Sequence, residues 1–315
     1  MSTPLLAKML RRRIFRLCQV RNVISGSIRL RSDSSSSQYC LDLVRKHDYE
    51  GFLSALLIPE ATQRTTVIAL RAFNVELALV AQKVSNATIA GQGRLNFWQD
   101  CLDKQNVPHH PVAQELQRAR TRHKLNKAFL QRLITSRKKQ LEKPGHETLA
   151  DLEQYAEDTV SPLLYLSLQA AAAQKPGSDY MNLINATSRL GKAIGLTYAL
   201  RGLAHATHSS ELGIPKDTLR RNKVHPEKMV RRHGSDKEVQ DAVYEVARRA
   251  FRHLDKARTV KVPKEVVPFL LTSVPADLYL KRLEKVNFNP FHPSLHKRLV
   301  TLHFRMWYNK LIGKF

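Results

Sequence analysis

The chain has 315 residues, of which 43% are hydrophobic, and this composition excludes a disordered or low-complexity protein. Its 52 Lys and Arg residues outnumber its 27 Asp and Glu residues, so the net charge is +25 and an anionic partner or compartment is needed to explain it. The three cysteines have no CxxC spacing, which excludes a disulfide scaffold or a cysteine-based zinc site.

Residues 1–38 have the composition of a mitochondrial transit peptide. The first 36 residues contain eight cations and the single acid Asp33, are rich in serine, and place apolar residues at roughly helical spacing. Arg11 to Arg13 interrupt the apolar run that a secretory signal would need. We therefore expect cleavage of residues 1–38 after import and a mature domain over residues 39–315. The alternative is a basic tail that binds nucleic acid.

No apolar stretch reaches the roughly 18 residues that a membrane-spanning helix requires. The longest candidate, Val160 to Ala173, is too short and contains Pro162, so it predicts a buried core helix. Any membrane contact is therefore expected to be peripheral.

Beyond residue 38, apolar residues recur at helical spacing without a convincing strand pattern. The expected helices cover 39–47, 60–84, 91–103, 112–141 with a break near His123, 148–173, 180–208 and 236–258, and two more lie within 263–315. Predicted loops cover 106–111, 175–179, 213–226 and 287–293. Short connections between long amphipathic helices predict one all-α bundle over residues 39–315.

Three stretches, taken in order, resemble the squalene/phytoene synthase family. They are ALRAFN at 69–74, LGKAIGLTYALR at 190–201 and LYLKRLEKVNFNPF at 278–291. The resemblance implies the helical bundle of isoprenoid (terpenoid) synthases. In active members of the family, two pairs of aspartates, spaced four residues apart on facing helices, hold the Mg²⁺ ions that ionise prenyl diphosphates.

The positions that match these aspartates carry no carboxylate in this chain. They are Ala78 and Gln82 in the first motif and Gly202 and Ala206 in the second. No aspartate occurs between Asp48 and Asp100, so the loss in the first motif does not depend on the register. We therefore expect a pseudoenzyme with no catalytic residues, no metal and no cofactor. The alternative is a prenyl transferase or a prenyl-lipid-binding protein that uses prenyl diphosphates.

Cations concentrate at 118–143 and 220–264, and on the expected 236–258 helix they lie opposite the apolar face. Attraction to anionic, cardiolipin-rich membrane would contribute roughly 1 kcal/mol per cation. The alternative is a merely solvated surface, and RNA binding is disfavoured because no RNP-like motif is present. The candidate membrane or partner surface comprises Arg220, Arg221, Arg231, Arg232, Arg248, Arg249 and Arg252.

A mitochondrial branch of the family with degenerate aspartate motifs acts in the assembly of respiratory complex I. Resemblance to that branch implies a non-catalytic role in early biogenesis of the membrane-embedded subunits, with assembly intermediates as partners and no nucleic acid. It also implies peripheral attachment to the matrix side of the inner membrane. Composition and charge are compatible with this role, while the pathway itself rests on the resemblance.

Overall fold

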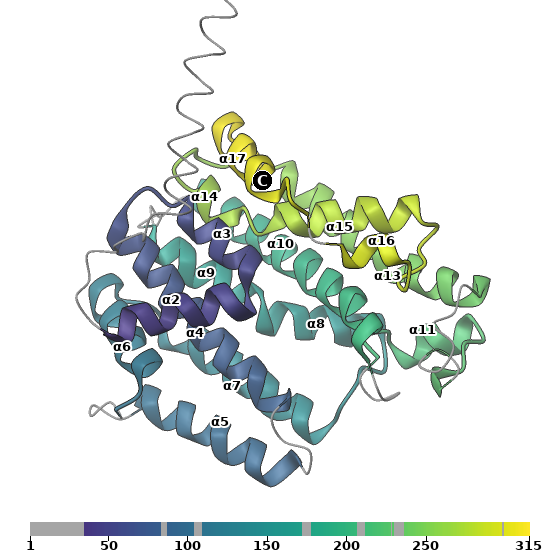
Figure 1. The fold of residues 1–315 in the computed structure, drawn as a ribbon, viewed down its shortest axis with the longest axis horizontal. Coiled ribbons are helices and arrows are strands. Elements are labelled where there is room, and N and C mark those ends of the chain that lie inside the picture. The colour runs from purple at the N-terminus through teal and green to yellow at the C-terminus, as the bar shows by residue number, and fades with distance from the viewer. Residues whose placement is uncertain are drawn as a thin grey trace, which may run out of the picture. The chain divides into compact units, whose positions relative to one another are not determined.

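All regular elements of the described chain are helices (Figure 1). The computed structural model describes residues 35–82, 87–103, 109–171, 178–206, 212–227, 229, 236–297 and 299–315. Residues 36–315 form one compact unit. The first described helix begins at Ser35, and residues 1–34 of the predicted transit segment lie outside the described residues. The prediction of an all-α fold is confirmed.

The first half of the described chain contains six helices. They are α2 (Ser35–His47), α3 (Tyr49–Leu56), α4 (Ala61–Gln82), α5 (Ala87–Asp103), α6 (Pro111–His123) and α7 (Lys127–Glu142). The predicted break near His123 is confirmed, because Lys124 adopts a left-handed conformation with φ 48° and ends α6. Asn126 then starts α7, since its side chain accepts a hydrogen bond from the Ala128 backbone N–H.

The second half adds further helices around the centre of the bundle. They are α8 (Leu149–Thr159), α9 (Ser161–Ala170), α10 (Ser178–Gly202), the short 3₁₀ turn η1 (Leu203–His205), α11 (Lys216–Arg221), α13 (Lys237–Arg258), α14 (Val267–Leu270), α15 (Ser273–Lys285), α16 (Pro293–His296) and α17 (Leu302–Ile312). Thr148 caps α8 by a reciprocal capping box with Asp151, at the predicted start.

Three predictions about these segments are wrong. The expected single helix over 148–173 is two helices, because Pro162 lacks a backbone N–H and lies in the first turn of α9. The expected loop at 213–226 contains α11, and residues 263–315 contain four helices instead of two. Helices α11, α14 and α16 have only four to six residues, too few for a helical period to stand out in the sequence.

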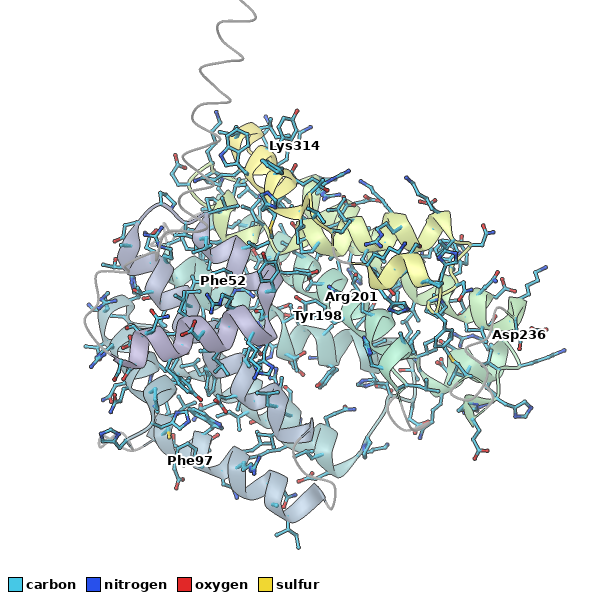
Figure 2. All side chains as sticks on the ribbon, in the orientation of Figure 1. Phe52, Phe97, Tyr198, Arg201, Asp236 and Lys314 are labelled. Carbon is cyan, nitrogen blue, oxygen red and sulfur yellow. The ribbon has the colours of Figure 1, made fainter. Side chains whose placement is uncertain are left out.

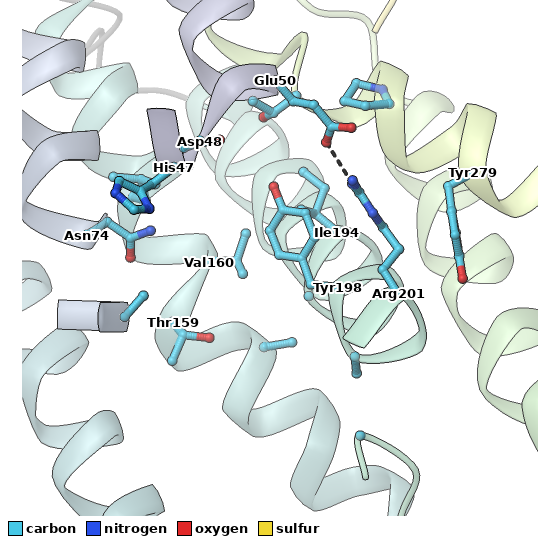
Figure 3. Close-up of a pocket in the computed structure, with 18 of the residues that line it drawn as sticks. His47, Asp48, Glu50, Asn74, Thr159, Val160, Ile194, Tyr198, Arg201 and Tyr279 are labelled. Atoms are coloured by element: carbon cyan, nitrogen blue, oxygen red, sulfur yellow. Dashed lines mark hydrogen bonds and ion pairs between the residues drawn. The ribbon is translucent and has the colours of Figure 1, made fainter. Parts of the chain in front are cut away.

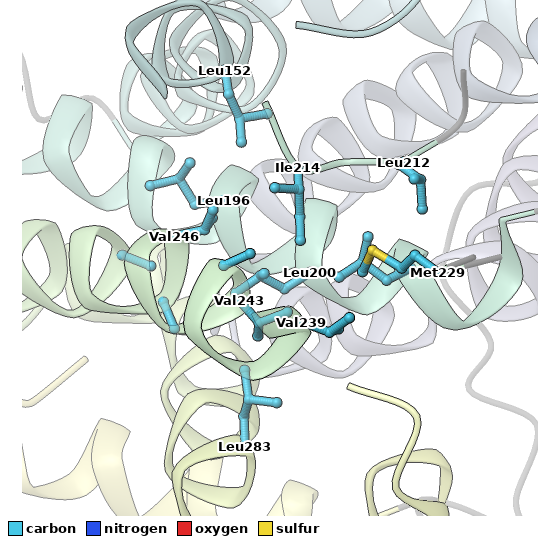
Figure 4. Packing of buried hydrophobic residues seen from close by; sticks show 14 of the residues in the cluster. Leu152, Leu196, Leu200, Leu212, Ile214, Met229, Val239, Val243, Val246 and Leu283 are labelled. Carbon is cyan, nitrogen blue, oxygen red and sulfur yellow. The ribbon is translucent and has the colours of Figure 1, made fainter. Parts of the chain in front are cut away.

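Helix α10 packs against α8, α9, α13 and α15, while α4 packs against α6, α7 and α9. Figure 4 shows the apolar cluster in which Leu196 and Leu200 of α10 meet Val243 and Val246 of α13. Helix α9 is buried along almost its whole length, in contact with both α4 and α10. The bundle therefore has α4 and α10 as its two central helices, with α9 between them.

Close contact between α10 and the α8–α9 pair depends on glycine. A Cβ added at Gly191 would lie 2.8 Å from the Ser161 Cα, and one at Gly195 would lie 2.9 Å from the Ala156 Cα. Only a residue without a side chain fits at these positions without displacing backbone. In the part of the chain that the structure describes, no helix is both long and apolar enough to span a bilayer.

Candidate functional site

A cavity of about 920 Å³ lies among the central helices (Figure 3). Its lining comes from α4, α7, α8, α9, α10 and α15, from residues 46–50 and from the segment that precedes α17. Among the described residues of the wall there are six cations and two acids, Asp48 and Glu50. The cations are Lys46, Arg71, Arg137, Arg201, Arg282 and Lys297. The cavity is therefore electropositive.

Arg71 of α4 is 4% exposed and is held at the cavity by the turn that starts α3. Its Nη1 lies 2.7 Å from Asp48 Oδ2, while Asp48 Oδ1 accepts a hydrogen bond from the Gly51 backbone N–H. A Cβ at Gly51 would lie 2.1 Å from the guanidinium, so glycine leaves the room that this ion pair occupies. The buried Nε of Arg71 has no hydrogen-bond partner within the described chain.

Arg137 of α7 faces the cavity with neutral partners. Its Nη2 donates to Asn74 Oδ1 at 2.7 Å and its Nη1 to the Leu133 carbonyl at 2.9 Å. Burial lowers the pKa of this guanidinium. Since the described contacts include no carboxylate on Arg137, its positive charge is available to an anion in the cavity.

Arg201, in the last turn of α10, closes another side of the cavity. Its Nη1 donates to Glu50 Oε2 at 2.7 Å, and its guanidinium lies 5.8 Å from the centre of the Tyr279 ring (Figure 3). Burial disfavours the charged form of Arg201, but attraction to the Glu50 carboxylate is the stronger effect. The pKa of Arg201 is therefore raised. The ion pair joins α3 to α10 across the cavity.

Tyr198 lies one helical turn before Arg201 and points into the cavity (Figure 3). It keeps 41% of its surface accessible because it faces this space, although the surrounding helices shield it from bulk water. That desolvation, together with the carboxylates of Asp48 and Glu50, raises the pKa of its phenol. Tyr198 is therefore a neutral hydrogen-bonding group at the cavity.

Part of the wall is apolar and includes Leu79, Leu163, Leu164 and Ile194. Among its polar members, Thr272 has a buried hydroxyl oxygen without a partner in the described chain. Buried polar atoms are normally hydrogen-bonded, so an unpaired one indicates a position that a ligand or water can satisfy. The arrangement suits a molecule with an anionic head and an apolar body.

The structure brings only one of the four predicted motif positions to the described wall. Ala78 of α4 lines the cavity, whereas Gly202 is an exposed residue at the end of α10 and Ala206 packs beside the apolar cluster of Figure 4. The side chain of Gln82 lies outside the described residues. Arg71 and Arg201 stand within the motifs ALRAFN and TYALR, so the sequence offered a signal for them, but it offered none for Arg137.

The described lining does not fit a Mg²⁺ ion. This hard cation prefers several oxygen ligands, yet Ala78 presents a methyl group, and the carboxylates of Asp48 and Glu50 are each paired with an arginine. Within the described residues, no group of three His, Cys, Asp or Glu side chains could hold a metal ion. The cavity offers cations to an anion in place of carboxylates to a metal.

The predicted basic surface is partly neutralised by neighbouring acids. Arg249 is paired with Glu153, and Arg221 lies 2.8 Å from Asp217 and 2.9 Å from Glu245. Arg220, Arg248 and Arg252 are exposed on α11 and α13, while Arg231 and Arg232 lie outside the described residues. Two of the five arginines that the structure describes therefore form ion pairs with other elements of the fold.

The profile of the squalene/phytoene synthase family matches residues 44–305, a range that includes every residue that lines the cavity. The chain belongs to the squalene/phytoene synthase family. Among solved structures, a dehydrosqualene synthase in complex with ligand superimposes with a TM-score of 0.72 at 15% identity, covering 88% of this chain and 95% of that one. A squalene synthase from Alicyclobacillus acidocaldarius gives a TM-score of 0.67 at 16% identity, covering 81% and 95%. These likenesses confirm the isoprenoid-synthase fold.

Curated relatives of higher identity carry a different kind of name. NADH dehydrogenase (ubiquinone) complex I, assembly factor 6 of Rattus norvegicus is 40% identical over 86% of this chain and 81% of its own length. The protein of the same name from Homo sapiens is 39% identical over 85% and 79%. The homolog from Drosophila melanogaster is 36% identical over 89% and 84%. Within the family, the chain is thus similar to proteins named for complex I assembly.

Proposed function

We propose that the chain is a non-catalytic assembly factor of mitochondrial respiratory complex I. The observation that supports this most directly is its 36–40% identity, over most of both chains, to animal proteins named as complex I assembly factors. The finer proposal is a role in early biogenesis of the membrane-embedded subunits, at the matrix face of the inner membrane. Entry into mitochondria would use the arginine-rich segment at residues 1–38.

The non-catalytic part of the proposal is supported by the chemistry of the cavity. Ionisation of a prenyl diphosphate requires divalent cations that neutralise the leaving pyrophosphate. Alanine, glutamine and glycine occupy the motif positions at 78, 82, 202 and 206, and the acids nearest the cavity are paired with arginines. Arginines can bind a phosphate, but they do not replace carboxylates as ligands for the metal.

A complementation experiment tests the assembly role. Cells in which the gene is disrupted should lose mature complex I on native gels while retaining the other respiratory complexes, and the full chain should restore it. Re-expression of an Ala78→Leu variant, which places bulk in the cavity, would show whether assembly requires that space. Normal complex I content in the disrupted cells would overturn the proposal.

A second candidate function, binding of a prenyl diphosphate or a similar lipid, is favoured by the apolar wall and by Arg137 with its neutral partners. The full chain would be titrated with farnesyl and geranylgeranyl diphosphate, with Mg²⁺ and with EDTA. Binding in EDTA that is weakened by Arg137→Gln, but not by Arg94→Gln on the exposed face of α5, would support a lipid-binding role. Turnover that EDTA abolishes would instead make the chain an active prenyl transferase.

A further inference from the structure

Helix α17 has an apolar surface on both of its sides. On one side, Leu302 and Met306 are buried against Val267, Leu271 and Val274 of α14 and α15 and the turn between them. Helix α17 ends at Gly313, which adopts a left-handed conformation with φ 69°. The helix is thus attached to the bundle by one face, and this attachment determines which side chains point outward.

The outward face of α17 is occupied by large apolar and aromatic side chains. Phe304 is 49% exposed, Trp307 43%, Tyr308 57% and Leu311 58%. Since these residues lie at helical intervals of three and four, they form one continuous stripe opposite Leu302 and Met306. We call the four residues, together with the 42% exposed Ile312, the α17 face. A contiguous stripe of exposed apolar side chains is typical of a surface that contacts another protein or a lipid.

Cations surround the α17 face. Arg305 and Lys314 are exposed on the same segment, and Figure 2 shows Lys314 projecting outward beside α17. Lys264 lies next to its end, because a Cβ at Gly313 would be 3.6 Å from the Lys264 Cγ. The positive charge of Arg64 is close enough to contribute to the lowered pKa of Lys310, after burial. An exposed acid, Glu265, follows Lys264 in the chain.

We propose that the α17 face docks on the surface of an anionic lipid bilayer. Trp, Tyr and Phe flanked by Lys and Arg suit the boundary between acyl chains and headgroups, where the rings enter the apolar layer and the cations meet phosphates. A second copy of the chain is disfavoured as the occupant, because two such faces would bring their clustered cations together. The inference rests on the proposed peripheral attachment and names the element that makes it.

The chain itself offers a direct readout, because it contains two tryptophans. Trp98 is 3% exposed and packs edge-on against Phe73 and Phe97, whereas Trp307 lies in the α17 face. A Trp98→Phe variant of the full chain therefore reports on Trp307 alone. On addition of phosphatidylcholine vesicles that contain cardiolipin, we expect its emission to shift to the blue and to be quenched by lipids brominated in their acyl chains.

The test variant is Phe304→Ser/Leu311→Ser, which we expect to weaken vesicle binding about tenfold, corresponding to about 1.4 kcal/mol. The matched control is Ile89→Ser/Met181→Ser, which removes two apolar side chains that are 86% and 57% exposed on α5 and α10 and should leave binding unchanged. All four substituted side chains are exposed, so circular dichroism should show equal helicity in both variants.

Equal vesicle binding by the test variant and the wild type would overturn the docking proposal, and so would two other outcomes. If the chain binds the vesicles but Trp307 emission does not change, another surface makes the contact, and peripheral attachment stands without the α17 face. If Trp307 becomes shielded as the protein concentration rises in the absence of lipid, the face is an interface between copies. The assembly role is tested separately, by the complex I content of complemented cells.

Discussion

The strongest prediction about stability concerns Glu153, which joins α8 to α13. The residue is 9% exposed, and its carboxylate accepts hydrogen bonds from Arg249 Nε and, at 3.1 Å, from Arg249 Nη2. His253 Nε2 lies 2.8 Å from Glu153 Oε1. Both partners are on α13, so one buried carboxylate fixes two helices that each pack against α10. We predict that Glu153→Gln weakens this connection.

The magnitude follows from the pKa of this carboxyl. Burial alone would raise it, but hydrogen bonds and charge from His253 and Arg249 prevail and lower the pKa from 4.5 to about 2. Each pKa unit corresponds to about 1.4 kcal/mol, so the favoured ionised form contributes about 3 kcal/mol at most. The Arg249 side chain is 42% exposed and can turn to solvent after the substitution. We therefore expect a loss of about 2 kcal/mol in the free energy of unfolding.

The sign of the pH dependence follows from the lowered pKa. A carboxyl whose folded pKa lies below its unfolded pKa stabilises the fold above about pH 4.5 and loses that contribution as the pH falls towards about 2. The gap in stability between wild type and Glu153→Gln should therefore be full at neutral pH and reduced by more than half at about pH 3.

Urea unfolding followed by circular dichroism, at several pH values, measures this gap. Glu245→Gln is the matched control, since Glu245 also pairs with an arginine, Arg221, but its side chain is more exposed, at 35% against 11% for Glu153. Its stability should remain close to that of the wild type at every pH. If Glu153→Gln is as stable as the control at neutral pH, or if its gap to the wild type does not depend on pH, the argument from the lowered pKa is refuted.

Three further predictions concern packing, targeting and attachment. Gly191→Ala should lower the free energy of unfolding by about 1–3 kcal/mol, because the new Cβ would meet the Ser161 backbone at 2.8 Å. Gly93→Ala should instead raise it by about 0.5–1 kcal/mol, because no atom lies within 4 Å of its Cβ. Thermal melts measure both changes. Deletion of residues 1–36 should leave a folded protein that isolated mitochondria do not import; import at normal efficiency would contradict the targeting prediction. Carbonate should release the imported chain from membranes, and retention in the pellet would indicate an attachment that is not peripheral.

The elements that can be predicted from the sequence are long amphipathic helices and helices that begin with a clear capping residue. The apolar face expected on 236–258 is buried as α13, and Thr148 starts α8, because both signals are local. The split between α8 and α9 was not predicted, since the apolar run continues through Pro162. Whether proline bends or ends a helix depends on packing around it, which is information from elsewhere in the chain.

The residues of the cavity are also hard to predict, because their positions depend on contacts between segments far apart in the sequence. The motif points to Ala78, whereas the sequence shows Arg137 only as part of a basic region, because its position at the cavity depends on Asn74 of another helix. Likewise, Arg249 shares a helix with the exposed Arg248, yet it is paired with Glu153 of α8. The sequence does not predict the α17 face, because α17 carries apolar residues on two sides and the pattern alone does not reveal which side is buried.

The position of α9 has a consequence for how the chain reaches its native state. Helix α9 touches α4, α7 and α8, which precede it in the chain, but also α10 and α14, which follow it. During synthesis, its apolar surface therefore stays incompletely covered until the polypeptide has extended to Val267–Leu270 of α14. A nascent or truncated chain that ends earlier exposes this helix to chaperones and to aggregation. Premature termination anywhere before α14 should therefore yield an insoluble product and not a smaller working protein.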